Sequence, residues 1–363
     1  MDNVWLVGGK LVAPQGTVGR ALKIRHGHIA AIAKRAPRSS TTINLRGAYL
    51  SPGFIDLHVW GPPAIVSREA VKWGTTTFLT TFGPESSDAL LARLRAFHAA
   101  RSTLSGAQCL GVHLEGPFLN TARAGALPSK WMRRPSMREL KRLSRLGRAH
   151  VKMITLAPEL ANVSEMIRWC KQHRIVVSLG HSEADAAVSE RAIEAGARAV
   201  THVFNGMRPF HHRTPSLLDV ALRDPRLTTM AICDGVHVSP SAFRLLIHAK
   251  GIGHIALVTD SIEHQGWNVI KRNGAYFTKN GTLAGSCLTM MQAVRNAVKF
   301  GEVSISDAVK MATEVPARLL GIDRTHGTLE VGKRADLVAF DSNFRVQLTM
   351  IGGRIVYQRG ESL

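Results

Sequence analysis

The sequence contains little cysteine and no long apolar run. Its 4 cysteines among 363 residues are Cys109, Cys170, Cys233 and Cys287, which are far apart and show no paired spacing. This spacing excludes a disulfide framework and a zinc site built from thiolates. No segment reaches the roughly 20 consecutive apolar residues that cross a membrane, and residues 1–7 lack the basic and apolar regions of a signal peptide. We therefore expect a cytoplasmic protein without a membrane span.

Acidic residues are also few relative to basic ones. The chain has 26 Asp and Glu against 47 Lys and Arg, which gives a formal net charge of +21 at pH 7. Such a charge attracts anions, either a phosphorylated metabolite or a nucleic acid, and does not choose between them. Many cations lie between Lys130 and Arg148, where Leu140, Leu143 and Leu146 recur at helical spacing, as on a solvated helix. Because no helix-turn-helix or zinc-finger motif is present, nucleic acid is not expected as a partner.

The remaining composition is that of an ordinary folded protein, with 45% hydrophobic and 20% charged residues. Short apolar segments bounded by glycine and proline predict strands near both ends of the chain. Neither group can bury an apolar face alone, so we expect them to form one small β-sandwich domain from residues 1–50 and 331–363. The predicted strands cover residues 4–7, 11–12, 21–25, 29–32, 336–340, 346–351 and 354–357.

Residues 51–330 show a different pattern, in which apolar strands alternate with amphipathic helices. This alternation is typical of an α/β fold with a parallel sheet. Eight candidate strands predict a (β/α)8 TIM-type barrel as the catalytic domain, with its site at the carboxyl ends of the strands. The strands are expected at residues 54–58, 76–80, 109–113, 153–156, 175–179, 199–202, 230–232 and 255–258. The helices are expected at residues 88–100, 136–146, 163–173, 183–195, 241–249, 288–300 and 306–320.

Ligand-type side chains follow several of these strands. Glu115 comes at the end of the third strand, and His181 and His202 directly follow two later apolar runs. One carboxylate and two imidazoles on three strand ends predict a three-ligand site for a divalent metal ion, with an open position for water. Asp260 follows the eighth strand and has the chemistry of a general base that takes a proton from an activated water.

Short motifs with chemical groups or glycine are spread along nearly the whole chain, namely Pro52-Gly53-Phe54-Ile55-Asp56, His113-Leu114-Glu115-Gly116-Pro117, Thr155-Leu156-Ala157-Pro158-Glu159, Gly180-His181-Ser182, Thr201-His202, Asp234-Gly235-Val236-His237-Val238, Thr259-Asp260, Leu283-Ala284-Gly285-Ser286 and Gly332-Lys333-Arg334-Ala335-Asp336. Together they resemble the N-acetylglucosamine-6-phosphate deacetylases of the amidohydrolase superfamily. The resemblance implies metal-dependent hydrolysis of an acetamide on a phosphorylated amino sugar, and it suggests a homodimer.

The resemblance also implies roles for individual residues. One divalent ion, Zn²⁺ in our prediction, would be held by Glu115, His181 and His202, while Asp260 handles the protons. The chemistry of Arg213 agrees with phosphate binding, since a guanidinium meets a phosphate with two parallel charge-assisted hydrogen bonds. Without the resemblance, Arg213 is equally well an ordinary surface arginine of a basic protein. The residues expected to bind the sugar phosphate are Ala126, Leu127, Asn205, Gly206, Arg213, His237 and Leu283.

Two positions depart from the family pattern. Many amidohydrolases carry His-x-His at the end of the first strand, which supports a second metal ion, whereas this chain has His58-Val59-Trp60. A tryptophan is no ligand, so we expect a single ion, with His58 either supporting the site or holding a weak second ion. Leu127 stands where the family pattern has a histidine that contacts the substrate. A leucine polarises no carbonyl, and losing such a donor costs roughly 10²- to 10³-fold in rate unless another group replaces it.

Three functions therefore follow from the sequence. The first is an enzyme that hydrolyses N-acetylglucosamine 6-phosphate, or a related N-acetylhexosamine 6-phosphate, to acetate and the free amino sugar. The second is an amidohydrolase of the same fold with a different N-acyl or cyclic-amide substrate, which Trp60 and Leu127 favour. The third is a non-catalytic relative that binds anions or nucleic acid through its basic surface.

Overall fold

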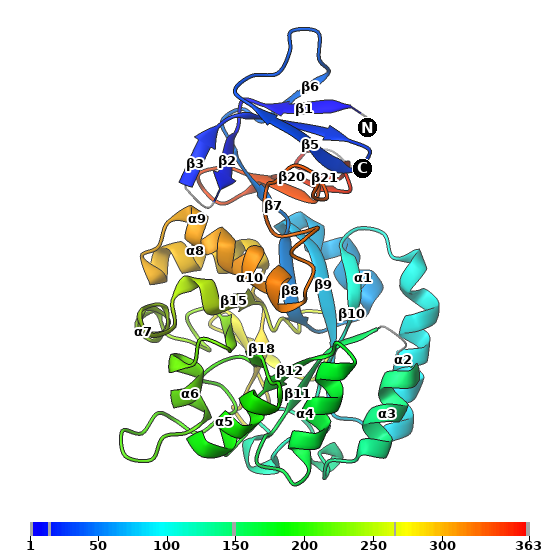
Figure 1. The fold of residues 1–363 in the computed structure, drawn as a ribbon, viewed down its shortest axis with the longest axis vertical. Helices are drawn as coiled ribbons and strands as arrows, with labels where there is room; N and C mark the ends of the chain where they lie inside the picture. Colours follow the sequence, from blue (N-terminus) through cyan, green and yellow to red (C-terminus); the bar gives the residue numbers. More distant parts are fainter. Residues whose placement is uncertain (1–2, 14–15, 147–149, 265, 361–363) are drawn as a thin grey trace.

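Eight parallel strands form a sheet whose order follows the chain from β8 to β15 (Figure 1). The computed structural model describes residues 3–13, 16–146, 150–264 and 266–360. The first strand meets the segment directly after the last one through a parallel bridge between Val59 and Ser261, and the Asp260 N–H donates to the His58 carbonyl at 2.9 Å. The predicted (β/α)8 barrel is thereby confirmed. Its strands are β8 (Phe54–Val59), β9 (Thr75–Phe82), β10 (Gln108–Glu115), β11 (Val151–Leu156), β12 (Val176–Leu179), β13 (Ala199–Val200), β14 (Thr228–Ile232) and β15 (Ile255–Val258).

Helices surround this barrel, and several of them begin at a residue whose side chain caps the first turn. The side chains of Ser86, Asp185 and Ser239 each accept a hydrogen bond from the first turn of their helix. Two helices, α1 and α6, were not predicted because they are short and carry little periodic signal. The helices are α1 (Pro63–Ala70), α2 (Ser87–Ala100), α3 (Met137–Leu146), α4 (Val163–Gln172), α5 (Ala186–Ala195), α6 (Leu217–Arg223), α7 (Pro240–Lys250), α8 (Met290–Gly301), α9 (Ile305–Ala312) and α10 (Glu314–Leu319).

The single helix predicted over residues 306–320 is wrong. The chain forms two helices there, α9 and α10, separated at Thr313, whose backbone is not helical (φ −135°, ψ −74°). Pro316 explains the break, because proline has no N–H to donate to the carbonyl four residues earlier and its ring crowds that carbonyl. A proline near the start of a new helix is well tolerated, and Pro316 lies in the first turn of α10.

The basic stretch predicted to form a solvated helix contains α3. Leu140 and Leu143 are fully buried on one face, while Arg138, Lys141 and Arg142 are exposed on the other. Arg148 lies outside the described residues. None of the helices in the described part of the chain combines the length and the apolar character needed to cross a membrane.

The two ends of the chain form a small β-sandwich on one side of the barrel (Figure 1). Its sheets enclose an apolar core that includes Leu6, Leu22, Leu50, Leu337 and Met350. The predicted sandwich built from both termini is therefore confirmed as part of the fold. One sheet has the order β5 (His28–Ala33), β4 (Ala21–Arg25), β1 (Val4–Val7), β6 (Thr42–Asn44), and the other β21 (Arg354–Gln358), β20 (Val346–Ile351), β19 (Leu337–Phe340), β7 (Tyr49–Pro52), β2 (Lys10–Ala13), β3 (Gly16–Gly19).

We propose that residues 1–50 with 331–363 form one domain and residues 51–330 the other. β7 runs across the boundary at residue 50, because it pairs with β2 and β19 and leads after Gly53 directly into β8. The two parts also contact each other through a hydrogen bond of 2.7 Å from the Thr349 hydroxyl to the Val71 carbonyl. The sandwich thus anchors the start of the first barrel strand.

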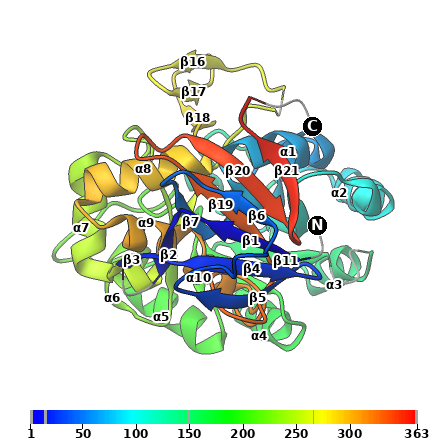
Figure 2. The same cartoon turned by 90° about the horizontal axis from the view of Figure 1, so that it is seen from above.

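A small antiparallel sheet follows the last barrel strand and was missed by the sequence analysis. It consists of β16 (Ile270–Arg272), β17 (Ala275–Phe277) and β18 (Leu283–Ser286). Figure 2 shows β16 and β17 projecting beyond the barrel, with β18 nearest to it. A parallel bridge between Ser261 and Ser286 attaches β18 to the mouth of the barrel. This attachment brings the residues of β18 to the site.

Candidate active site

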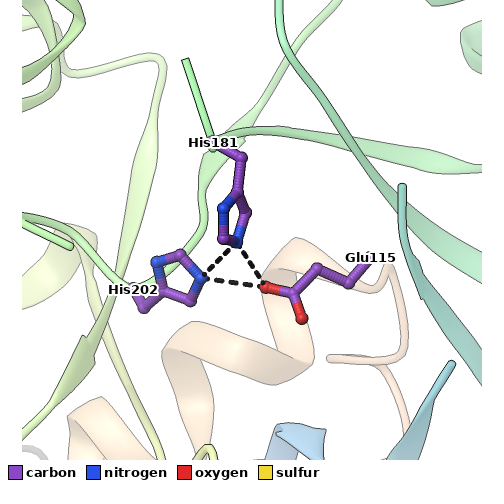
Figure 3. Close-up of side chains that lie close together, drawn as sticks. All are labelled: Glu115, His181 and His202. Atoms are coloured by element: carbon purple, nitrogen blue, oxygen red, sulfur yellow. Dashed lines mark hydrogen bonds and ion pairs between the residues drawn. The ribbon is translucent and has the colours of Figure 1, made fainter. Parts of the chain in front are cut away.

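Glu115, His181 and His202 converge at the mouth of the barrel, as Figure 3 shows. Oε1 of Glu115 lies 3.1 Å from Nε2 of His181 and 2.9 Å from Nε2 of His202, and the two Nε2 atoms are 3.1 Å apart. Ligands bound at about 2.0 Å in tetrahedral geometry lie roughly 3.3 Å from one another. The three residues, which are 2–6% exposed, therefore have the spacing of ligands around one small cation.

The remaining ring nitrogens of the two histidines support this interpretation. Nδ1 of His181 lies 2.7 Å from the carbonyl of Arg123, and Nδ1 of His202 lies 3.2 Å from that of Asn205. A carbonyl only accepts hydrogen bonds, so each Nδ1 carries the proton and each Nε2 is left with a lone pair. Two lone pairs and a carboxylate oxygen repel one another unless a cation lies between them. The donor set fits a divalent metal ion.

The electrostatics of the three ligands also favour positive charge. Burial raises the pKa of Glu115, but His58, His181 and His202 outweigh this effect and hold that pKa well below its usual value. Burial lowers the pKa of His181, and the adjacent Glu115 carboxylate more than reverses this, so the pKa is raised. The carboxylate is therefore ionised, as a metal ligand must be.

Backbone strain marks the residues that follow the strands. His181, His202 and Asp260 have φ angles of 48°, 29° and 48°. Residues with a Cβ rarely adopt this left-handed region, and such strain is typical of functional sites. Gly206 completes the turn after His202, because a Cβ there would lie only 3.1 Å from Nδ1 of His181. The absence of a side chain at Gly206 allows its backbone to pack against the ligand rings.

Asp260 lies beside the three ligands and is held by two neighbours. Its Oδ1 accepts a hydrogen bond of 2.9 Å from Nε1 of Trp60. Nε2 of His58 lies 3.0 Å from the same oxygen and 3.6 Å from Oε2 of Glu115. The imidazole of His58 is not oriented for a hydrogen bond from Nε2 to either oxygen. Burial lowers the pKa of His58, but Glu115 and Asp260 together raise it to about 9. His58 therefore lies next to the carboxylates of both Asp260 and Glu115, on the buried side of the site.

A buried polar chain continues from His58 into the barrel. Nδ1 of His58 is 2.9 Å from Nδ1 of His113, and Nε2 of His113 is 2.8 Å from the Thr155 hydroxyl. Burial and the nearby His58 lower the pKa of His113 to about 3, so this histidine is neutral. Burial also raises the pKa of Asp56 to about 6, although Thr259 and His58 donate hydrogen bonds to its carboxylate. The floor of the site is thus polar and fully enclosed.

A pocket opens above the ligands and contains most of the residues predicted to bind substrate. Among these, Ala126, Leu127, Asn205, Gly206, His237 and Leu283 line it together with Glu115, His181, His202 and Asp260. Arg213 is not part of this wall and lies on an exposed loop. The structure therefore brings six of the seven predicted residues to one cavity and places Arg213 outside it.

Several contributors were missed from the sequence. Trp267 comes from the segment after β15, and its ring centroid lies 5.0 Å from that of Trp60. Thr282, Ala284 and Gly285 reach the pocket from the β17–β18 region. These residues follow no strand of the barrel, so the strand-end rule does not find them. Asp234 was also missed as the partner of His237, although its spacing of three residues in a turn was a usable signal.

Comparison with known proteins identifies the family of this site. Residues 49–356 match the amidohydrolase family. The chain belongs to that family. A curated relative, N-acetylglucosamine-6-phosphate deacetylase of Bacillus subtilis (strain 168), is 35% identical, and the match covers 98% of this chain and 96% of the relative. The resemblance noted in the sequence is thereby confirmed.

Two further similarities extend this result. N-acetylgalactosamine-6-phosphate deacetylase of Escherichia coli O157:H7 is 33% identical over 92% of this chain and 94% of its own length. A solved structure of N-acetyl-D-glucosamine-6-phosphate deacetylase from Mycobacterium smegmatis, in complex with N-acetyl-D-glucosamine-6-phosphate, has a TM-score of 0.90 and 29% identity, covering 99% of this chain and 100% of that one. The chain thus resembles deacetylases for two hexosamine phosphates.

Proposed function

We propose that this protein hydrolyses the acetamide of an N-acetylhexosamine 6-phosphate, with N-acetylglucosamine 6-phosphate as the first substrate to test. The observation that carries the proposal is the convergence of Glu115, His181 and His202 beside Asp260 in a pocket. The chain is a hydrolase of amide bonds, as its full-length similarity to named deacetylases indicates. Because the relatives include enzymes for glucosamine and galactosamine derivatives, both sugars are candidates.

The residues of the site fit the steps of amide hydrolysis. When bound, a divalent ion supplies a Lewis acid that polarises the acyl carbonyl and lowers the pKa of water. Asp260 takes a proton from the attacking water and delivers it to the departing amine nitrogen, so that the C–N bond breaks and acetate and the free amino sugar result. The enclosed floor formed by His58 and His113 keeps bulk water from the far side of these carboxylates.

The sugar phosphate would extend away from the reacting carbonyl. His237 and Asn205 line the pocket and offer hydrogen-bonding groups, while Leu283 lines it from β18. Arg213 lies outside the pocket wall on an exposed loop, so its role would be at the outer end of the ligand, where the phosphate emerges. The overall charge of +21 would draw such an anion towards the protein.

Acetate release by the purified, metal-loaded protein tests the proposal directly. We expect turnover of N-acetylglucosamine 6-phosphate or N-acetylgalactosamine 6-phosphate, and loss of most of it in Asp260→Asn, since an amide cannot accept and return a proton. No release from either sugar phosphate by a protein that holds its metal would refute the proposal. The second candidate, another N-acyl or cyclic-amide substrate, is favoured by the apolar side chains of Trp60, Leu127 and Trp267 in the pocket.

Five finer features belong to the same proposal. One ion per chain is expected, since three ligands converge while the first strand adds only His58, and Zn²⁺ suits one carboxylate with two imidazoles. We further propose a cytoplasmic homodimer that does not bind nucleic acid. A nucleic-acid titration tests the last point, because neutralising phosphates would give a steep salt dependence.

A further inference from the structure

Trp60 contacts the turn that carries Asp260 with both its backbone and its side chain. Its N–H donates to the Ser261 carbonyl at 2.9 Å, and its indole Nε1 donates to Oδ1 of Asp260 at the same distance. The side chain is almost completely buried, with Trp60 only 3% exposed. Trp60 stands where the His-x-His pattern has its second metal-ligating histidine. It therefore offers no ligand to a metal and instead gives a hydrogen-bond donor to the carboxylate of Asp260.

The indole ring is fixed by the side chains and backbone around it. One face packs against Trp267, at 5.0 Å between ring centroids, and Leu127 belongs to the same apolar cluster. On another side, a Cβ on Gly83 would lie 2.7 Å from Cη2 of Trp60, so the ring nearly touches that backbone. A buried, close-packed ring has few alternative rotamers, and the direction of its N–H is set.

Asp260 needs such support because its backbone has a strained φ of 48°. Its Oδ1 receives the Trp60 hydrogen bond and faces His58, whereas among the described residues Oδ2 has no hydrogen-bond partner. We propose that Trp60 is a positioning residue, which holds Oδ1 of Asp260 and thereby leaves Oδ2 in place for proton transfer. The proposal rests on the proposed function, because it assigns a role in the proton transfer that Asp260 performs there.

Kinetic comparison of two matched variants tests this role. Trp60→Phe keeps an aromatic side chain, although a smaller one, and removes the N–H; a hydrogen bond to a charged group is strong enough that we expect kcat to fall roughly tenfold to hundredfold. KM and metal content should stay close to those of the wild type. Trp5→Phe makes the same change in a buried tryptophan of β1 in the β-sandwich, outside the pocket, and its kcat should stay within about threefold of the wild type.

A double variant separates positioning from general packing. In Asp260→Asn the group that Trp60 holds has lost its function, so adding Trp60→Phe should not lower the residual turnover further. If the two losses multiply, or if Trp60→Phe matches Trp5→Phe, Trp60 does not act through Asp260 and the inference is wrong.

A proton NMR measurement tests the hydrogen bond between Trp60 and Asp260 without any substrate. The chain has 6 tryptophans, and the indole N–H signal of Trp60 is assigned by its loss in Trp60→Phe. We expect this proton to exchange slowly and its signal to move in Asp260→Ala, while the Trp267 signal moves less. An unchanged Trp60 signal in Asp260→Ala would overturn the inference. Inactivity of a metal-loaded wild type would count only against the proposed function.

Discussion

Nδ1 of His237 donates a hydrogen bond to Oδ2 of Asp234 at 2.6 Å, and both side chains are only 4% exposed. Oδ1 of Asp234 accepts the backbone N–H groups of Val236 and His237, each at 2.8 Å. The carboxylate therefore fixes both the turn after β14 and the tautomer of the imidazole. With Nδ1 occupied by Asp234, Nε2 is the nitrogen left for a ligand in the pocket.

This pair predicts the effect of removing Asp234. Asp234→Ala should raise KM for the phosphorylated substrate about tenfold, because the buried ring loses its partner and its orientation. The effect on kcat should be smaller, since binding remote from the broken bond is largely uniform between ground and transition states. Steady-state kinetics of Asp234→Ala, His237→Ala and the double variant measure this, and a double variant much worse than His237→Ala would contradict it.

The metal content of single variants tests the three ligands. His181→Ala and His202→Ala should lose the ion and the activity together, because two remaining ligands hold a divalent ion weakly. Asp260→Asn should keep the ion. His248→Ala is a suitable control, since this histidine is exposed on α7 and should change nothing. Elemental analysis should find about one ion per chain, and two stoichiometric ions would show that His58 forms a second site.

The parts of the site that could be predicted from the sequence follow from one geometric rule. The carboxyl ends of parallel strands meet at one mouth of a barrel, so Glu115, His181, His202 and Asp260 could be placed together without coordinates. The hydrogen bond between Trp60 and Asp260 could not be predicted, because it joins residues 200 positions apart and depends on the rotamer of one ring. Such contacts are set by packing and not by periodicity.

Loops were predicted least well for a related physical reason. Arg213 was expected at the phosphate from the family resemblance, with which its chemistry agrees, but a loop residue has no register that fixes its direction. The small sheet that supplies Leu283 to the pocket has short strands with mostly exposed residues, such as β16, which give no clear apolar alternation. The positions of both segments depend on tertiary contacts.

Arg213 gives the test of phosphate binding outside the pocket. Arg213→Ala should raise KM for the phosphorylated substrate at least tenfold and change turnover of an unphosphorylated analogue less, because an arginine and a phosphate dianion form strong paired hydrogen bonds. Arg208→Ala provides a control from the same loop, where the guanidinium bonds to the Glu183 carbonyl instead. Equal losses on both substrates in Arg213→Ala would mean that Arg213 is structural.

The apolar side of the pocket predicts selection by the acyl group. Trp60, Leu127 and Trp267 form one cluster there, and the indole N–H of Trp60 is already bound to Asp260. An N-glycolyl substrate would bring a hydroxyl without a partner to this wall, so its kcat/KM should be lower than for N-acetyl by about tenfold to hundredfold. Leu127→Ser should reduce this discrimination. Equal kcat/KM for the two substrates would place the acyl group elsewhere in the pocket.

Lys250 predicts how stability depends on pH. It ends α7 with 7% exposure, and its ammonium donates to the Asp224 carbonyl. Burial, partly offset by Asp224, lowers its pKa from 10.5 to about 8. Between these values the unfolded chain binds more protons than the folded one, so stability rises with pH, by about 2 kcal/mol after allowing for solvent screening. This contribution is complete above the unfolded pKa and is lost as pH falls through 8. Urea unfolding at pH 7.5 and 10.5 should therefore measure the free energy of unfolding of the wild type and of Lys250→Met. We expect the difference between the two proteins to shift in favour of the wild type at high pH. A constant difference would show that Lys250 keeps its ordinary pKa.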